Sequence, residues 1–411
     1  MTIGMLLVAI ILIMPIALGL FGLLGYWNSK TRYKLIYCAM FAMIFGIAGF
    51  CFKDPATNPD LVRYLQILHQ YKGETLFESF NLAYNNLFAV DIYFHIVSLF
   101  KNDQMLPAIS AFLYYFVILY IMKDYRLRVS INNLDFMIYS SFVVCATIFC
   151  SIVNGIRWPL SFILFILAFY RDVVQKKKNV WTWMIYIASI LFHFSAIVLL
   201  LIRLILFIKD KKIVIIIGAF GVLVPQLIRL LSDRFGSINT GITVIDQLLY
   251  SLNRSNMYFQ WNQGEWADIV RNSTYYKIEA CYYYVIAFLL LLCLLLLYKK
   301  KNKDGINRKS FTIEDRFSFY LMVVTLISFT MSAHTYIRFV TPVIVCFVFV
   351  VFRFYKEYQT SVIRKIINGS FVLLSGVGIF LNLYLLRTMV DLPEYFSDIV
   401  TFGLFKFILG Y

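Results

Sequence analysis

Long apolar runs separated by short charged loops constrain this 411-residue chain more than any other feature of its sequence. Runs such as 105–122 and 279–298 carry almost no charge over the length that a helix needs to cross a bilayer. Because lipid cannot pair free backbone N–H and C=O groups, such spans are expected to be helices. With 61% hydrophobic residues in total, the sequence predicts an all-α polytopic membrane protein of about twelve transmembrane helices, in a range of roughly 10–14.

The net charge of +16 would suit nucleic-acid binding if it formed one patch, but its distribution indicates membrane topology. Six short loops hold 25 of the 38 Lys and Arg and 8 of the 22 Asp and Glu, a net charge of +17, and the remaining segments net −1. The positive-inside rule places these loops in the cytoplasm, where they face anionic lipid, and no nucleic-acid partner is expected. The loops are residues 25–34, 123–135, 171–180, 203–212, 299–316 and 353–366.

This topology divides residues 1–411, taken as a single transmembrane domain, into spans and outer segments. The outer-face segment 53–104 is expected to hold interfacial helices near 74–88 and 91–100, with a new helix starting at Asp60. A large outer-face loop is expected at 232–277, and an external amphipathic tail from Asp391 to Tyr411. The predicted spans are 2–24, 35–52, 105–122, 136–153, 158–170, two arms of a kinked hairpin within 181–208, 213–231, 279–298, 317–333, 339–352 and 368–387.

Four polar interruptions fall on the predicted outer face, and three of them pair an arginine with a following aromatic residue. A cation at membrane depth is costly, so it is usually paired or functional. Arginine also matches phosphate oxygens with two parallel hydrogen bonds and stays charged when partly desolvated. The cluster therefore suggests a site for a lipid-linked pyrophosphate. Its members are Asp60 with Arg63 and Tyr64, Asn154 with Arg157, His193 with Ser195, and His334 with Arg338.

The same residues also suit structural roles. Arg157 near a helix end could extend to lipid headgroups. His193 and His334 could be core histidines bonded to backbone carbonyls. Asp60 could cap a helix or pair with Arg63.

These motifs resemble those of the EpsG-type membrane proteins, relatives or analogues of the Wzy polysaccharide polymerases. The resemblance rests on Asp60-x-x-Arg63-Tyr64, Asn154-x-x-Arg157, Leu191-Phe-His193-Phe-Ser195-Ala196 and Arg338 before an apolar span. It implies a bacterial plasma-membrane glycosyltransferase, similar to the GT-C kind, that joins oligosaccharide repeat units carried on undecaprenyl pyrophosphate, with its active site outside. The products would be exopolysaccharide, capsule or O-antigen. A polysaccharide chain-length regulator is a candidate partner.

The chemistry implied by this resemblance assigns roles to the interrupting residues. Arg157 and Arg338, assisted by Arg63, would stabilise the departing diphosphate, and Tyr64 and Asn154 would contact substrate. The candidates for the general base are Asp60, His193 and His334. No acidic metal motif is evident in the outer segments, so neither a metal nor another cofactor is expected.

Two other functions fit parts of the pattern. A flippase for the same lipid-linked sugar would need charges along a path through both leaflets and internal repeats, whereas the candidate residues crowd one face. A membrane acyltransferase could use His193 or His334, but no acceptor-and-base pair is evident on the cytoplasmic side.

Overall fold

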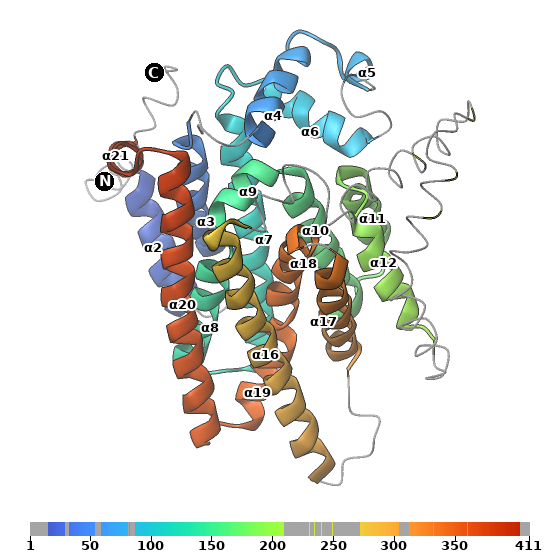
Figure 1. Ribbon diagram of the computed structural model, residues 1–411, viewed down its shortest axis with the longest axis vertical. Helices are drawn as coiled ribbons and strands as arrows, with labels where there is room; N and C mark the ends of the chain where they lie inside the picture. Colours follow the sequence, from blue (N-terminus) through green and yellow to red (C-terminus); the bar gives the residue numbers. More distant parts are fainter. Residues whose placement is uncertain are drawn as a thin grey trace. The chain divides into compact units, whose positions relative to one another are not determined.

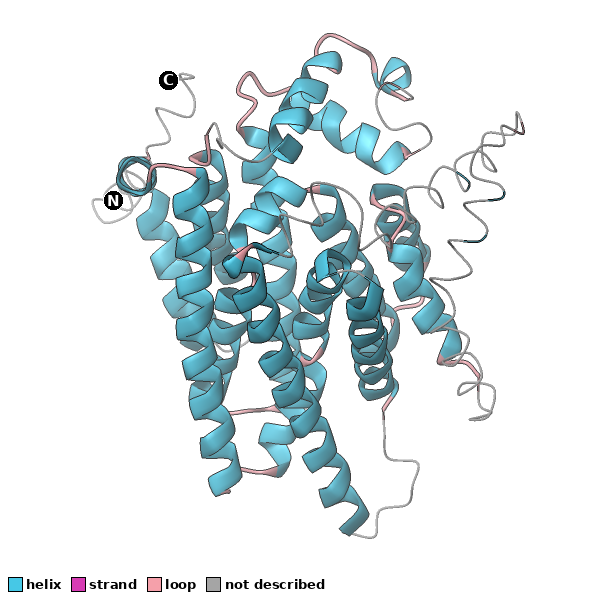
Figure 2. Cartoon of the chain, in the orientation of Figure 1, coloured by secondary structure: helices cyan, strands magenta, loops and turns pink. Residues whose placement is uncertain are grey.

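The computed structural model describes residues 15–28, 33–53, 59–80, 87–208, 272–303, 312–331, 333–359 and 361–402, with 82, 230, 234, 240 and 249 as single residues. All regular elements in these ranges are helices, and no strand occurs within them (Figures 1 and 2). The expected all-α class is therefore confirmed for this part of the chain. The chain divides into two compact units, Met1–Ile197 with Val348–Tyr411 (unit 1) and Val198–Phe347 (unit 2). That both belong to one membrane domain stays a prediction.

Unit 1 contains most of the helices (Figure 1). They are α2 (Pro15–Asn28), α3 (Lys34–Phe50), α4 (Pro59–Gln70), α5 (Leu76–Ser79), α6 (Phe88–Ser98), α7 (Met105–Val129), α8 (Asn133–Ala146), α9 (Phe149–Gly155), α10 (Arg157–Phe169), the π-helix η1 (Tyr170–Val174), α11 (Val180–Phe192), α19 (Val348–Glu357), α20 (Val362–Met389) and α21 (Leu392–Thr401). Unit 2 contains α16 (Thr274–Lys303), α17 (Ile313–Met331) and α18 (Ala333–Cys346). The short helix α12 (Ala196–Ile205) crosses the boundary between the units.

Glycines let α2, α3 and α7 pack closely. A Cβ added to Gly22 of α2 would come within 2.4 Å of the backbone nitrogen of Phe41 in α3. A Cβ added to Gly49 of α3 would come within 2.6 Å of the carbonyl oxygen of Pro107 in α7. In membranes, where lipid is as apolar as leucine, helices associate through such close backbone approach. α7 also contacts α8, α9, α10 and α19, so these closely packed helices hold a large part of unit 1 together.

Four of the six basic loops meet at one end of unit 1. Lys34 pairs with Asp124, which also accepts a hydrogen bond from Gln175 at 3.2 Å. Arg364 Nε lies 3.4 Å from Asp135 Oδ1. These contacts join the loops 25–34, 123–135, 171–180 and 353–366 that the charge distribution grouped together. Which side of the membrane this end faces stays a prediction.

The expected count of about twelve spans is not confirmed. Four segments in the described ranges are long and apolar enough to cross a membrane: Met105–Val129, Thr274–Lys300, Ile337–Glu357 and Val362–Met389. α8 and α9 qualify together as a fifth, bent by 53° at a short break. The expected span 213–231 lies outside the described residues except Leu230, and 2–24 is described only from Pro15. The stretch 181–208 divides at residues 193–195 into the short helices α11 and α12, and the expected hairpin stays a prediction.

Within residues 53–104, whose outer-face position stays a prediction, the described ranges fold into α4, α5 and α6, which partly corrects the expectation. The predicted interfacial helix at 74–88 is wrong in extent, because the capping box of Thr75 and Glu78 starts a helix of one turn only. α6 begins at Phe88 and accords with the helix expected near 91–100. α4 begins at Pro59, so Asp60 lies in its first turn instead of capping it from outside.

The large loop expected at 232–277 lies outside the described residues up to position 271, apart from three single residues. Its last four residues are helical, because α16 begins at Thr274. In the expected tail, α21 returns to the end of α3. Tyr395 Oη donates to the carbonyl oxygen of Ala48 at 3.0 Å, and Lys53 Nζ lies 2.9 Å from Asp398 Oδ2.

Candidate functional site

A break between α8 and α9 positions the candidate site. Asn382, on the membrane-length helix α20, accepts a hydrogen bond from the Phe149 N–H at 2.7 Å. Its Nδ2 donates to the carbonyl oxygens of Cys145 at 3.0 Å and Thr147 at 3.2 Å. At membrane depth a helix break persists only where its backbone groups are paired. A single amide therefore stabilises the bend that brings α9 into contact with α4.

Asn154 and Arg157 follow this break, and Gly155 between them makes a close contact with Trp158. Asn154 of α9 is 4% exposed and donates from Nδ2 to Met389 Sδ at 3.3 Å, whereas its Oδ1 has no hydrogen-bond partner within the described residues. Gly155 ends α9 against the indole of Trp158, whose Nε1 would lie 2.2 Å from an added Cβ. Glycine thus allows α10 to start immediately beyond α9, with Arg157 half-buried at its first position.

The first turns of α4 carry the motif Asp60, Arg63 and Tyr64. Arg63 Nη2 lies 2.8 Å from Asp60 Oδ1, and its guanidinium carbon lies 5.4 Å from the centre of the Tyr64 ring. Burial raises the pKa of the Tyr64 phenol, while the positive charge of Arg157 lowers it and Asp60 raises it. The phenol is therefore neutral at physiological pH, and it lies within the electrostatic reach of Arg157.

His193 lies in the short break between α11 and α12. The Ser195 N–H donates to His193 Nδ1 at 3.2 Å, and Ser195 Oγ lies 2.6 Å from the same nitrogen. Because a backbone N–H can only donate, Nδ1 acts as an acceptor and the ring proton is on Nε2. In this tautomer His193 offers a donor at Nε2, which suits binding a phosphate or sugar oxygen better than removing a proton.

Packing brings these groups to one end of unit 1. Ser161 lies four residues after Arg157, one helical turn or about 6 Å along α10, and its hydroxyl lies 3.2 Å from the carbonyl oxygen of His193. A series of aromatic contacts, with ring centres 5.6–6.1 Å apart, runs from Phe192 through Tyr93 and Phe94 to Tyr64. α4 contacts α6 and α9, α9 contacts α10, and α11 contacts α10 and α6, so the five helices that carry these residues adjoin one another. Figure 1 shows them at one end of unit 1.

Two of the predicted residues lie in the second compact unit of the chain. Arg338 and His334 belong to α18 of unit 2. Arg338 is half-buried, and the side chain of His334 lies outside the described part of the chain. The structure thus groups Asp60, Arg63, Tyr64, Asn154, Arg157 and His193 in unit 1, and the participation of Arg338 and His334 stays a prediction.

Sequence reasoning missed four residues that build the site: Asn382, Gly155, Ser161 and Met389. Asn382 had a detectable signal, because an amide in the middle of an apolar helix requires a partner in lipid. Gly155, directly before the arginine, also indicated a close approach. Nothing in the sequence pointed to Ser161 or Met389, because their partners are 28 and 235 residues away.

The fold and the site define a helical membrane protein in which arginines, a buried amide and a histidine gather at the ends of several helices. No group of three or more His, Cys, Asp or Glu that could hold a metal lies within the described ranges, and metal independence stays a prediction. The EpsG family model matches residues 34–391, so the chain belongs to the EpsG family, a Wzy-like polysaccharide polymerase family. Comparison with curated proteins and with solved structures gave no match.

Proposed function

We propose that this protein polymerises oligosaccharide repeat units carried on undecaprenyl pyrophosphate, at the outer face of the bacterial plasma membrane. Membership of the EpsG family is the observation that carries the proposal. The half-buried Arg157 beside Tyr64 and the buried Asn154 supports it, because a cation at a membrane surface suits a diphosphate held by a lipid tail.

The reaction forms one bond and breaks another at the same carbon. The hydroxyl oxygen of the incoming unit attacks the anomeric carbon of the growing chain, and the bond from that carbon to the pyrophosphate oxygen breaks. The hydroxyl proton passes to a base, and the lipid pyrophosphate leaves as an anion. The protein must therefore supply positive charge where the leaving group develops its own charge.

Arg157 fits this role as the central cation of the site in unit 1. Arg63 adds a second cation on α4, and its exposed pair with Asp60 leaves it able to exchange partners. The His193 Nε2–H is suited to donate to the same diphosphate or to a sugar oxygen. We infer that Arg338 of unit 2 completes the set.

Asp60 is the base candidate that the geometry of unit 1 favours. His193 already uses Nδ1 as an acceptor and carries its proton on Nε2, so it has no nitrogen left to receive the hydroxyl proton. Asp60 pairs with Arg63 at an exposed position of α4. The Arg63 side chain would turn to the diphosphate when substrate binds and leave the carboxylate free to accept the proton. His334 stays the alternative base.

We propose that Asn154 forms a hydrogen bond to the sugar of the repeat unit. Its Oδ1 is buried without a hydrogen-bond partner in the described structure, and a buried acceptor in that state costs about 1–3 kcal/mol. A hydroxyl or an amide N–H of the repeat unit would satisfy it.

The test uses the purified full chain in nanodiscs with synthetic undecaprenyl-pyrophosphate-linked repeat units, EDTA, and gel separation of the glycans. A ladder of products is expected from the wild type and is expected to be lost with R157A. The matched control R387A removes an exposed arginine near the end of α20 and should retain the ladder. No ladder from the wild type, with labelled lipid crossing the bilayer of liposomes instead, would replace this proposal with the flippase function.

A further inference from the structure

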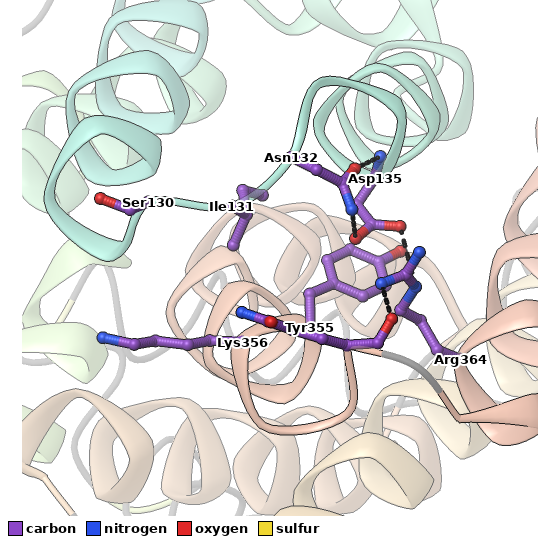
Figure 3. Close-up of a pocket in the computed structure, with 8 residues that line it drawn as sticks. Ser130, Ile131, Asn132, Asp135, Tyr355, Lys356 and Arg364 are labelled. Carbon is purple, nitrogen blue, oxygen red and sulfur yellow. Dashed lines mark hydrogen bonds and ion pairs between the residues drawn. The ribbon is translucent and has the colours of Figure 1, made fainter.

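A cavity of about 400 Å³ lies between the loop joining α7 to α8 and the loop joining α19 to α20. Its walls include Ser130, Asn132, Asp135, Lys356 and Arg364 (Figure 3). The volume falls in the range of small-molecule sites. The cavity is at the end of unit 1 where the basic loops meet, and none of the candidate catalytic residues lines it.

The acidic group of this cavity is already neutralised. Asp135 is 1% exposed and accepts from Asn368 Nδ2 at 2.8 Å and from Asn132 Nδ2 at 2.8 Å. Arg364 Nε completes its surroundings at 3.4 Å. Figure 3 shows Arg364 turned toward Asp135. Arg364 Nη1 also donates to the carbonyl oxygen of Gln359. The carboxylate therefore does not repel an anion as an isolated charge would.

The remaining charge in the cavity is positive. Lys356 is exposed, points away from the Asp135–Arg364 pair, and has no ion-pair partner among the described residues (Figure 3). Two helices also begin beside the cavity, α8 capped by Asn132 and α20 capped by Ser361. Helix N-termini carry partial positive charge, which adds to the attraction for an anion.

We propose that this cavity binds the phosphate group of a phosphate ester that carries free hydroxyls, with Lys356 as its principal cation. The Ser130 hydroxyl has no hydrogen-bond partner in the described residues and lines the same wall, so it can bond a hydroxyl of the ester. Both loops belong to the set that the positive-inside rule assigns to the cytoplasm. The ligand is therefore a phospholipid headgroup of the inner leaflet or a soluble phosphate ester.

Lys356 belongs to α19 and Ser130 directly follows α7, so a ligand that contacts both side chains joins these two helices. It should stabilise the folded protein by a free energy that grows with the logarithm of its concentration above the dissociation constant. This inference does not depend on the proposed polymerase activity.

The experiment titrates phosphatidylglycerol into the full chain in a neutral detergent and follows its thermal unfolding. K356Q is expected to weaken the apparent affinity about tenfold, the loss expected for one charge-assisted hydrogen bond. K365Q is the matched control, because Lys365 is exposed, lies in the first turn of α20 next to Arg364 and does not line the cavity. It should change the affinity less than about twofold, since it alters only surface charge.

Equal losses in both variants would overturn the proposal, because diffuse surface charge would then explain the binding. Unchanged affinity in both would overturn it as well. A second titration uses sn-glycerol 3-phosphate without anionic lipid. If sn-glycerol 3-phosphate stabilises the wild type but not K356Q, the ligand is a soluble ester. If it stabilises neither, while phosphatidylglycerol still shows an effect that depends on Lys356, the ligand is the lipid headgroup.

Discussion

Asn382 allows a quantitative test of how the helix break is held. Replacing it by leucine in N382L keeps the volume similar but removes the partner of three backbone groups: the Phe149 N–H and the carbonyls of Cys145 and Thr147. Hydrogen bonds between membrane helices contribute about 0.6 kcal/mol on average and about 1.7 at most. Three such bonds give an expected loss of about 2–5 kcal/mol in the free energy of unfolding.

The measurement is SDS-induced unfolding of the purified protein, followed by circular dichroism. S375A is the matched control, because Ser375 lies two turns earlier on the same helix and donates only to its own helix, at Phe371. Its free energy of unfolding should stay within about 0.5 kcal/mol of the wild type. A loss in N382L no larger than that in S375A would refute the role of Asn382 at the break. N382L should also reduce polymer output more than its unfolded fraction explains, because α9 carries Asn154.

Three further predictions concern the site itself. G155A should destabilise the protein by about 1–3 kcal/mol, because the new Cβ meets the Trp158 indole. Adding W158L to G155A should restore the stability. If it does not, the contact with Trp158 is not the cause of the loss. R63A removes an exposed pair with Asp60, so it should change the free energy of unfolding by less than about 1 kcal/mol. It should nevertheless lower glycan output about tenfold in the gel assay. Undiminished output would show that Arg63 is not part of the site. H193N keeps an acceptor for the backbone N–H of Ser195 but loses the Nε2 donor. The variant should therefore fold normally, and its polymerisation should be about 10- to 100-fold slower. Turnover equal to that of the wild type would show that Nε2 contacts no substrate.

Much of the architecture follows from hydropathy and charge, because these quantities are local. The helical class needs only the apolar runs, and the meeting of Lys34 with Asp124 agrees with a grouping based on lysine and arginine counts alone. The extent of α5 was mispredicted because its cap decides it: Thr75 and Glu78 close a single turn. In α4, Pro59 occupies the first helical position, so Asp60 lies in the first turn instead of capping it.

The candidate site was only partly accessible from the sequence. Arg157 and Asn154 could be found because polar groups at membrane depth are costly. The bond from Ser195 to His193 determines which ring nitrogen carries the proton, and spacing alone gives no indication of it. Residues 60, 157 and 193 are distant in the chain, so their proximity depends on helix packing that a single sequence does not reveal.

The one face of α20 that contacts α8 and α9 explains how a break can be built into an otherwise apolar bundle. Asn368 donates to Asp135, Asn382 accepts from the Phe149 N–H at the break, and Met389 accepts from Asn154. These positions are 14 and 7 residues apart, which is a heptad spacing and therefore a single helix face. At 1.5 Å per residue they extend about 32 Å, close to the thickness of the hydrocarbon core. One helix thus fixes its neighbours at the basic end, at the break and at the candidate site, so substitutions on this face should be more damaging than equal changes on the opposite, lipid-exposed face.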